Sequence, residues 1–184
     1  MAPRPLQNHP LRRWFTGMVE DVLYAQVGLC DPGVAEYLSD LLVEFVHVDH
    51  VFALRDARGR PLQQVAEMLT DAVSPPGTSD TDHRFFVHKH IGDFALFWTG
   101  VYPSNLRRLA RRGKRDGLLD YLAQGKRSYA IASELTDDAT PPPGALLRRL
   151  SDQFETCVYG LSLVRRGWED RDPASLAAVR ALWR

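Results

Sequence analysis

Histidine and carboxylate side chains gather in two apolar segments of this chain, LLVEFVHVDHVFAL (residues 41–54) and HRFFVHKHIGDFALFW (residues 83–98). Five of the six histidines lie in these two segments. An ionisable group among apolar neighbours needs a partner or a ligand, because burying it alone is costly. The two segments therefore predict a buried polar cluster that could do chemistry.

Helical spacing groups the polar residues of the first segment. Glu44 and His47 are three residues apart, and His50 follows one turn later, so the three share one side of a helix. Leucine, valine and phenylalanine cover nearly all the rest of this helix, which predicts that it lies centrally in a bundle.

The second segment places His90 on the same helical face as Phe94 and Phe97, with Asp93 at the flank of that face. His88 falls on another side, so we expect it to be exposed. If the two helices face each other, His90 and Asp93 meet the polar residues of the first segment across the core.

Such a meeting would supply three imidazoles and two carboxylates, a ligand set that suits Fe, Mn or Zn. Helical bundles build carboxylate-bridged metal sites from the same residue types, including Glu-x-x-His pairs. The predicted metal ligands are Glu44, His47, His50, His90 and Asp93.

The alternative interpretation is that His47 and His90 are buried neutral imidazoles bonded to carboxylates such as Glu44 and Asp93. A ferritin-like site would need a second Glu-x-x-His pair, and the chain has only one. Haem ligation and acid–base catalysis stay open, and the sequence identifies no catalytic residue.

A basic segment, SNLRRLARRGKR (residues 104–115), predicts a short surface helix whose leucines face inward and whose arginines face outward. An acidic protein partner would fit this surface. The predicted partner-binding residues are Arg107, Arg108, Arg111, Arg112 and Arg115.

Charge is unevenly divided along a chain that is neutral overall. Residues 1–102 carry 8 Lys and Arg against 13 Asp and Glu, a formal charge of −5, whereas residues 103–184 carry 15 against 10, or +5. This split favours a protein partner or a homo-oligomer. The zero net charge argues against a dedicated nucleic-acid binder.

A chain of 184 residues with 45% hydrophobic content can form one compact domain over residues 1–184. We expect residues 1–10 to be flexible and loops near residues 74–82 and 137–144. The two cysteines, Cys30 and Cys157, do not make a disulfide scaffold, and no stretch is apolar enough for a membrane span. A cytoplasmic protein is expected.

Turn and cap signals predict an all-α bundle of six or seven helices, two of them apolar and central. Asp31 and Pro32 form a helix start, and we expect that helix to end near Leu54. Residues 55–61 are interpreted as a polar turn between helices, in preference to a hairpin. The other expected helices cover residues 11–28, about 62–73, 82–102, 104–113, 116–135 and 145–168, with a short one after Pro173.

These observations favour a non-enzymatic interaction or regulatory protein. The alternative is a metal-binding helical bundle, such as an oxygen-activating non-haem iron protein, that uses the histidine and carboxylate cluster. The sequence leaves open whether the chain is an enzyme.

Overall fold

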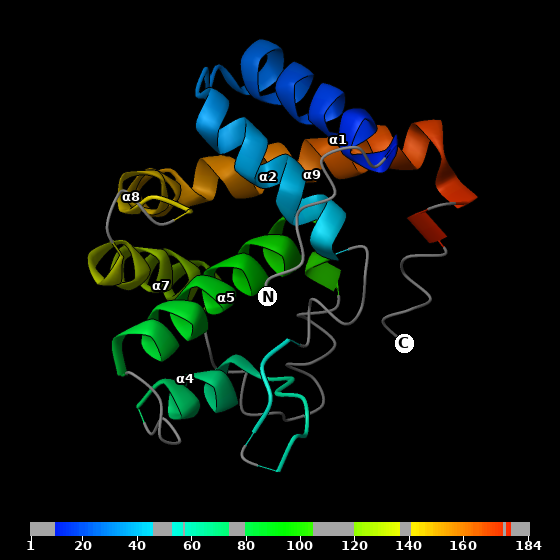
Figure 1. Cartoon of the computed structure of the whole chain (residues 1–184). Helices are drawn as coiled ribbons and strands as arrows, with labels where there is room; N and C mark the ends of the chain where they lie inside the picture. Colours follow the sequence, from blue (N-terminus) through cyan, green and yellow to red (C-terminus); the bar gives the residue numbers. More distant parts are fainter. Residues whose placement is uncertain are drawn as a thin grey trace.

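The computed structural model confirms an all-α bundle (Figure 1). It describes residues 10–45, 53–56, 58–73, 80–104, 120–136, 141–174 and 176–177. Within these ranges the structure contains seven α-helices and one π-helix, and the one extended pairing is an isolated bridge. None of the helices in these ranges has both the length and the apolar character needed to cross a membrane.

The N-terminal helix changes its type along its length. α1 (Pro10–Glu20) continues into the π-helix η1 (Asp21–Val27), where the sequence predicts one helix over residues 11–28. The turn ends at Gly28, whose φ of 79° is readily adopted only by glycine. The helix is therefore continuous, but its last two turns are wider than the apolar spacing indicates.

The helix start at Asp31 is confirmed. α2 (Pro32–Phe45) begins at the predicted proline, and the Asp31 carboxylate accepts a hydrogen bond from the Val34 amide at 3.1 Å. The Asp31 carboxylate also pairs with the Arg149 guanidinium at 2.7 Å, which joins the start of α2 to the C-terminal half of the chain.

The predicted end of this helix near Leu54 is wrong. Leu54 and Arg55 are not helical; Arg55 forms an antiparallel bridge with Pro61, and the Leu62 amide donates to the Leu54 carbonyl at 2.8 Å. The turn between them is closed by Asp56, which accepts hydrogen bonds from two backbone amides. The hairpin-like interpretation that the sequence analysis set aside is the correct one for these residues, and α4 (Val65–Val73) follows it.

α5 (Asp80–Gly100) runs through the middle of the bundle, as Figure 1 shows. It packs against α2, α4, α7 (Tyr121–Leu135) and α9 (Phe154–Arg171). Every residue from 90 to 98 is buried, because neighbours cover the helix on all sides. The prediction that α5 is an apolar central helix is confirmed.

The C-terminal helix is broken where the sequence predicts continuity over residues 145–168. α8 (Gly144–Asp152) ends at Gln153, whose φ and ψ of −110° and 23° are not helical, and α9 starts at Phe154. Apolar spacing continues across the break, so the pattern alone could not show it. The change of direction lets α8 lie beside α7, while α9 packs against α5 and passes behind α2 in the view of Figure 1.

Two glycines bring α5 and α7 unusually close together. A Cβ atom on Gly92 would lie 2.6 Å from the ring of Tyr129, and one on Gly125 would meet Ala95 at 2.8 Å as well as the Phe154 ring. The Tyr129 ring therefore packs directly against the α5 backbone at Gly92. This contact fixes the position of the Tyr129 hydroxyl, which is part of the site described below.

Substituting Gly92 with alanine should destabilise the protein by about 1–3 kcal/mol, the usual range for overpacking a core. Urea denaturation measures the change. Gly17→Ala in α1 is the control, since nothing lies within 4 Å of its added Cβ and alanine favours a helix by about 1 kcal/mol. Equal effects of the two substitutions would contradict the role given to the Gly92 contact.

Candidate functional site

The carboxylate of Asp93 on α5 is buried, with 3% of the residue exposed. Its Oδ1 accepts hydrogen bonds from the hydroxyls of Tyr37 at 2.6 Å and Tyr129 at 2.7 Å. Its Oδ2 accepts one from the Lys89 ammonium at 2.7 Å. We call these four residues the Asp93 network; it joins α2, α5 and α7.

Local structure explains how these groups meet. Lys89 and Asp93 are four residues apart on α5, so their side chains lie on one face of the helix. Tyr37 reaches them from α2 and Tyr129 from α7, and the two rings stand edge to face, 6.2 Å apart. The Lys89 ammonium also lies 5.4 Å from the centre of the Tyr37 ring, where a cation is attracted by the ring face.

Tyr37, Tyr129 and Lys89 have pKa values above their usual ranges. Burial raises the pKa of Tyr37 and of Tyr129, and the Asp93 carboxylate raises both further. Burial by itself lowers the pKa of Lys89, but the neighbouring Asp93, followed by Tyr37 and Glu44, outweighs it, so the net pKa lies above its usual value. All three groups keep their protons at neutral pH, so none is suited to proton transfer there.

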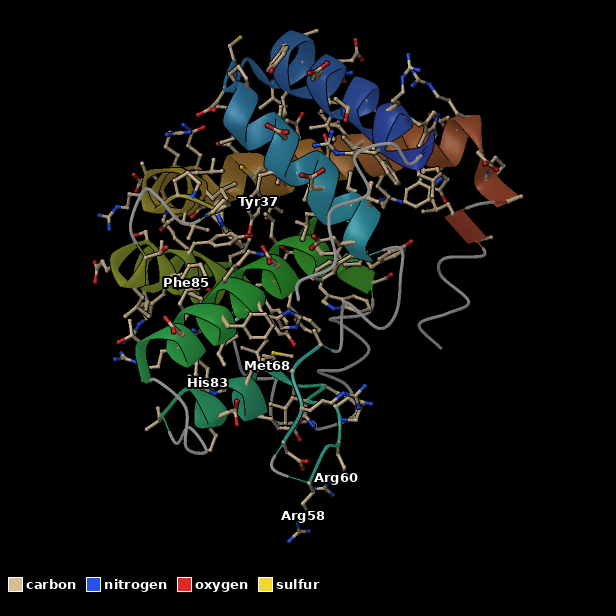
Figure 2. The ribbon with its side chains drawn as sticks, in the orientation of Figure 1. Tyr37, Arg58, Arg60, Met68, His83 and Phe85 are labelled. Carbon is tan, nitrogen blue, oxygen red and sulfur yellow. The ribbon has the colours of Figure 1, made fainter. Side chains whose placement is uncertain are left out.

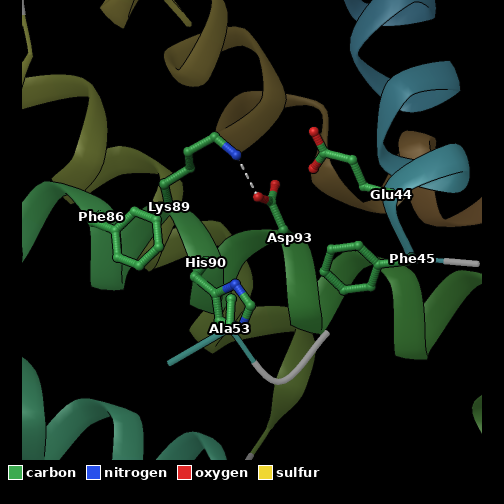
Figure 3. Close-up of a pocket in the computed structure, with 7 residues that line it drawn as sticks. All are labelled: Glu44, Phe45, Ala53, Phe86, Lys89, His90 and Asp93. Atoms are coloured by element: carbon green, nitrogen blue, oxygen red, sulfur yellow. Dashed lines mark hydrogen bonds and ion pairs between the residues drawn. The ribbon is translucent and has the colours of Figure 1, made fainter. Parts of the chain in front are cut away.

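A cavity of about 130 Å³ opens beside the network, between α2, α5 and the chain at residue 53 (Figure 3). Lys89 and Asp93 form part of its wall, and Glu44 reaches toward them from α2 in the same view. We call this cavity the α2–α5 pocket. Its lining residues are Glu44, Phe45, Ala53, Phe86, Lys89, His90 and Asp93.

Aromatic side chains make up the apolar side of the α2–α5 pocket. The His90 ring lies between Phe45 and Phe86, with ring centres 6.2 Å and 6.5 Å away. Phe86 is 49% exposed, although most large apolar side chains of α5 are buried. The exposed Phe86 ring lies at the mouth of the pocket, where a ligand could contact it.

Three of the five predicted metal ligands line this one pocket: Glu44, His90 and Asp93. The other two, His47 and His50, lie outside the described residues. Among the residues that the structure does describe, no group of three or more histidine, cysteine, aspartate or glutamate side chains is placed to hold a metal ion. The five-ligand metal site therefore stays a prediction.

The two other histidines of the second segment, His83 and His88, lie outside the α2–α5 pocket. The His83 Nε2 lies 3.0 Å from the Asp71 carboxylate, so this pair links α5 to α4. Figure 2 labels His83 where these two helices lie side by side. His88, which the sequence analysis expects to be exposed, is buried, because α5 is covered on that side too. Burial lowers the pKa of His88, and the charges of Arg84 and Arg127 lower it further.

Sequence reasoning identified Asp93 but missed its three partners. Tyr37 and Tyr129 are distant in sequence, and nothing in their spacing points to α5. The Lys89–Asp93 spacing of four residues was a usable signal, since opposite charges at that spacing on a helix pair with each other. The predicted partner-binding residues, Arg107, Arg108, Arg111, Arg112 and Arg115, lie outside the described residues.

Comparisons of the chain with models of protein families, with curated proteins and with solved structures found no match. The function of the chain is therefore inferred from the geometry of the α2–α5 pocket and the chemistry of its walls.

Replacing Asp93 with asparagine should lower the free energy of unfolding by about 3 kcal/mol, because the partly buried Lys89 ammonium loses its counter-charge and two tyrosine hydroxyls lose a charged acceptor. Asp40→Asn is the matched control on the protein surface, where the carboxylate pairs with Arg12 at 2.6 Å and is 38% exposed. That change should cost less than about 1 kcal/mol. Denaturant unfolding of both variants compares them, and an Asp93→Asn variant as stable as the control would contradict the network.

Stability should fall as the pH rises above about 10, where unfolded lysine and tyrosine side chains begin to lose their protons. The raised pKa values mean that the folded state holds these protons more tightly than the unfolded state. The stabilisation is therefore complete below pH 10 and is lost progressively above it. In Tyr37→Phe the decline measured by urea unfolding at a series of pH values should be shallower, and an unchanged slope would contradict this assignment.

Proposed function

We propose that this chain is a non-enzymatic regulatory or interaction protein that binds a small organic cation in the α2–α5 pocket. The observation that carries the proposal is the composition of the pocket wall: two carboxylates, Glu44 and Asp93, with one ammonium, Lys89, and aromatic rings on the apolar side. These three charged groups sum to a formal charge of −1 (two negative, one positive), which favours a positively charged ligand over an anion.

The aromatic rings strengthen this assignment. Phe45 and Phe86 line the pocket, and a cation over the face of an aromatic ring gains about 0.5–2 kcal/mol, more as water is excluded. A planar cation such as guanidinium could stack on a ring while donating hydrogen bonds to the Glu44 carboxylate.

The size of the pocket limits the ligand. A volume of about 130 Å³ is slightly below the roughly 150 Å³ of a protein cavity that holds one benzene molecule. The ligand, or the part of it that enters, is therefore a small group such as an alkylammonium or guanidinium.

The fixed protonation of Lys89, Tyr37 and Tyr129 supports a binding role in preference to acid–base catalysis. A protonated lysine is also a poor nucleophile, which argues against a covalent role for Lys89. The network beside the pocket holds the wall in place, so binding requires little rearrangement of the protein.

A bound metal is the second candidate, favoured by the presence of Glu44, His90 and Asp93 around one pocket. The Lys89 ammonium, 2.7 Å from Asp93 Oδ2, supports the organic cation over the metal, because it already occupies a position where a metal ion would approach that oxygen. The predicted ligands His47 and His50 would complete such a site.

Binding of guanidinium should be measurable by titration calorimetry at constant ionic strength, with sodium acetate as the anionic comparison. Glu44→Gln keeps the size of the side chain and removes its charge, so it should weaken guanidinium binding about tenfold, which corresponds to about 1.4 kcal/mol. Glu36→Gln is the matched control. Glu36 also lies on α2, but it pairs with Arg12 at 3.1 Å and does not line the pocket.

Three outcomes decide between the candidates. Guanidinium binding that Glu44→Gln weakens and Glu36→Gln does not supports the proposal. Absence of cation binding, or equal affinity for acetate, contradicts it. Elemental analysis that finds stoichiometric Fe, Mn or Zn in the wild type, and none in His90→Ala, supports the metal in its place.

A further inference from the structure

A second, larger cavity of about 260 Å³ lies between the π-helix η1 and helix α9, on residues that the first proposal does not use. Its floor is apolar and consists of Met18, Val22 and Leu163, of which the first two are buried. We call it the η1–α9 cavity. An apolar floor with polar groups at the edge is the usual composition of a site for a small organic molecule.

Charged groups of both signs surround this floor without neutralising one another. Arg166 and Asp170 are four residues apart on α9, yet they form no ion pair within 4 Å, whereas the neighbouring pair Arg165 and Glu169 does so at 2.8 Å. Arg171 also lines the cavity, and it too has no ion-pair partner in the described part of the chain. These charges are therefore available to a ligand.

A second carboxylate of the cavity belongs to Asp21, at the first position of η1. Its carboxylate accepts one hydrogen bond, from the Gln26 amide at 3.3 Å, and both residues line the cavity. With Asp21 and Asp170 against Arg166 and Arg171, the formal charge of the cavity is zero (two negative, two positive). A ligand that carries one charge of each sign matches this arrangement better than a simple anion or cation does.

Two features of the backbone line the η1–α9 cavity: the π-helical turns of η1 and a glycine inside α9. A π-helical turn is rare in proteins and occurs often at functional sites, and here it supplies Asp21, Val22 and Gln26. Gly167 lines the cavity from the interior of α9, where glycine is about 1 kcal/mol less favourable than alanine. A Cβ atom there would approach the Met18 Cε at 3.3 Å, so a larger side chain would fill part of the space.

We propose that the η1–α9 cavity binds a free zwitterionic amino acid with an apolar side chain. Arg166 and Arg171 would receive the carboxylate, Asp21 and Asp170 the ammonium, and the apolar floor the side chain. The charged groups are exposed, so each contributes modestly and the affinity falls as salt screens them. This assignment shares no residue with the α2–α5 pocket and does not depend on it.

The experiment titrates the full chain with L-leucine, N-acetyl-leucine and leucinamide at constant ionic strength, and follows the backbone amides of η1 and α9 by NMR. Leucine carries both charges, whereas the acetylated ligand keeps only the carboxylate and the amide only the ammonium. We expect saturable shifts in η1 and α9 with leucine, and weaker binding of each derivative by about two- to fivefold.

Variants locate the binding. Arg166→Gln should weaken leucine binding by about two- to fivefold, while its neighbour Arg165→Gln should leave the affinity unchanged, since Arg165 pairs with Glu169 and does not line the cavity. Gly167→Leu should abolish binding by filling the space, with thermal melting to confirm that the variant is folded. Arg166 is exposed, so its substitution should leave folding intact, whereas Arg165 is partly buried, so thermal melting also checks that the Arg165→Gln variant is folded.

The proposal is overturned if leucine gives no saturable shifts in η1 and α9, or if either derivative binds as tightly as leucine. It is also overturned if Arg165→Gln weakens binding as much as Arg166→Gln, which would indicate general attraction to a charged surface. Shifts confined to α2 and α5 would assign leucine to the other pocket and overturn it equally.

Discussion

A carboxylate that is almost completely buried determines how three helices of this protein meet. Both oxygens of Asp93 are used, one by two tyrosine hydroxyls and the other by the Lys89 ammonium. A shift of α2 or α7 relative to α5 would break at least one of these bonds and leave a polar group without a partner, which costs about 1–3 kcal/mol, and more for a charge. The close approach of α5 and α7 at Gly92 supports this network, because it fixes the position of the Tyr129 ring relative to α5.

Sequence patterns that span one or two helical turns correctly predicted the start of α2 and the central position of α5. Asp31 and Pro32 start α2 because a carboxylate can cap free amides and proline fits the first turn, and the structure shows that bond at 3.1 Å. The apolar residues on α5 identified it as a central helix. Because Asp93 lies among them, it was expected to need partners. These inferences need no information about distant parts of the chain.

The features that escaped prediction depend on contacts between distant segments or on small local energies. Tyr37 and Tyr129 are 56 and 36 residues from Asp93, and no spacing rule connects them. The break at Gln153 and the wider turns of η1 leave the apolar spacing almost intact, so periodicity cannot reveal them. The bridge between Arg55 and Pro61 is closed by Asp56, whose side chain bonds to the backbone of the turn, a stabilisation that competes with helix formation at that point.

Two residues of the α2–α5 pocket contribute both to the stability of the fold and to the charge that a ligand meets. A substitution at either of them changes both properties at once. Lys89 and Asp93 belong to the network and line the pocket, so any change to them alters the packing of α2, α5 and α7 together with the charge that a ligand meets. Glu44 influences Lys89 through its charge, but it is half-buried at the pocket wall and is not one of the four residues of the network. A ligand that binds only the folded state also stabilises that state by mass action. Glu44 is therefore the position where the charge of the pocket can be changed while the interaction that holds the three helices together is kept.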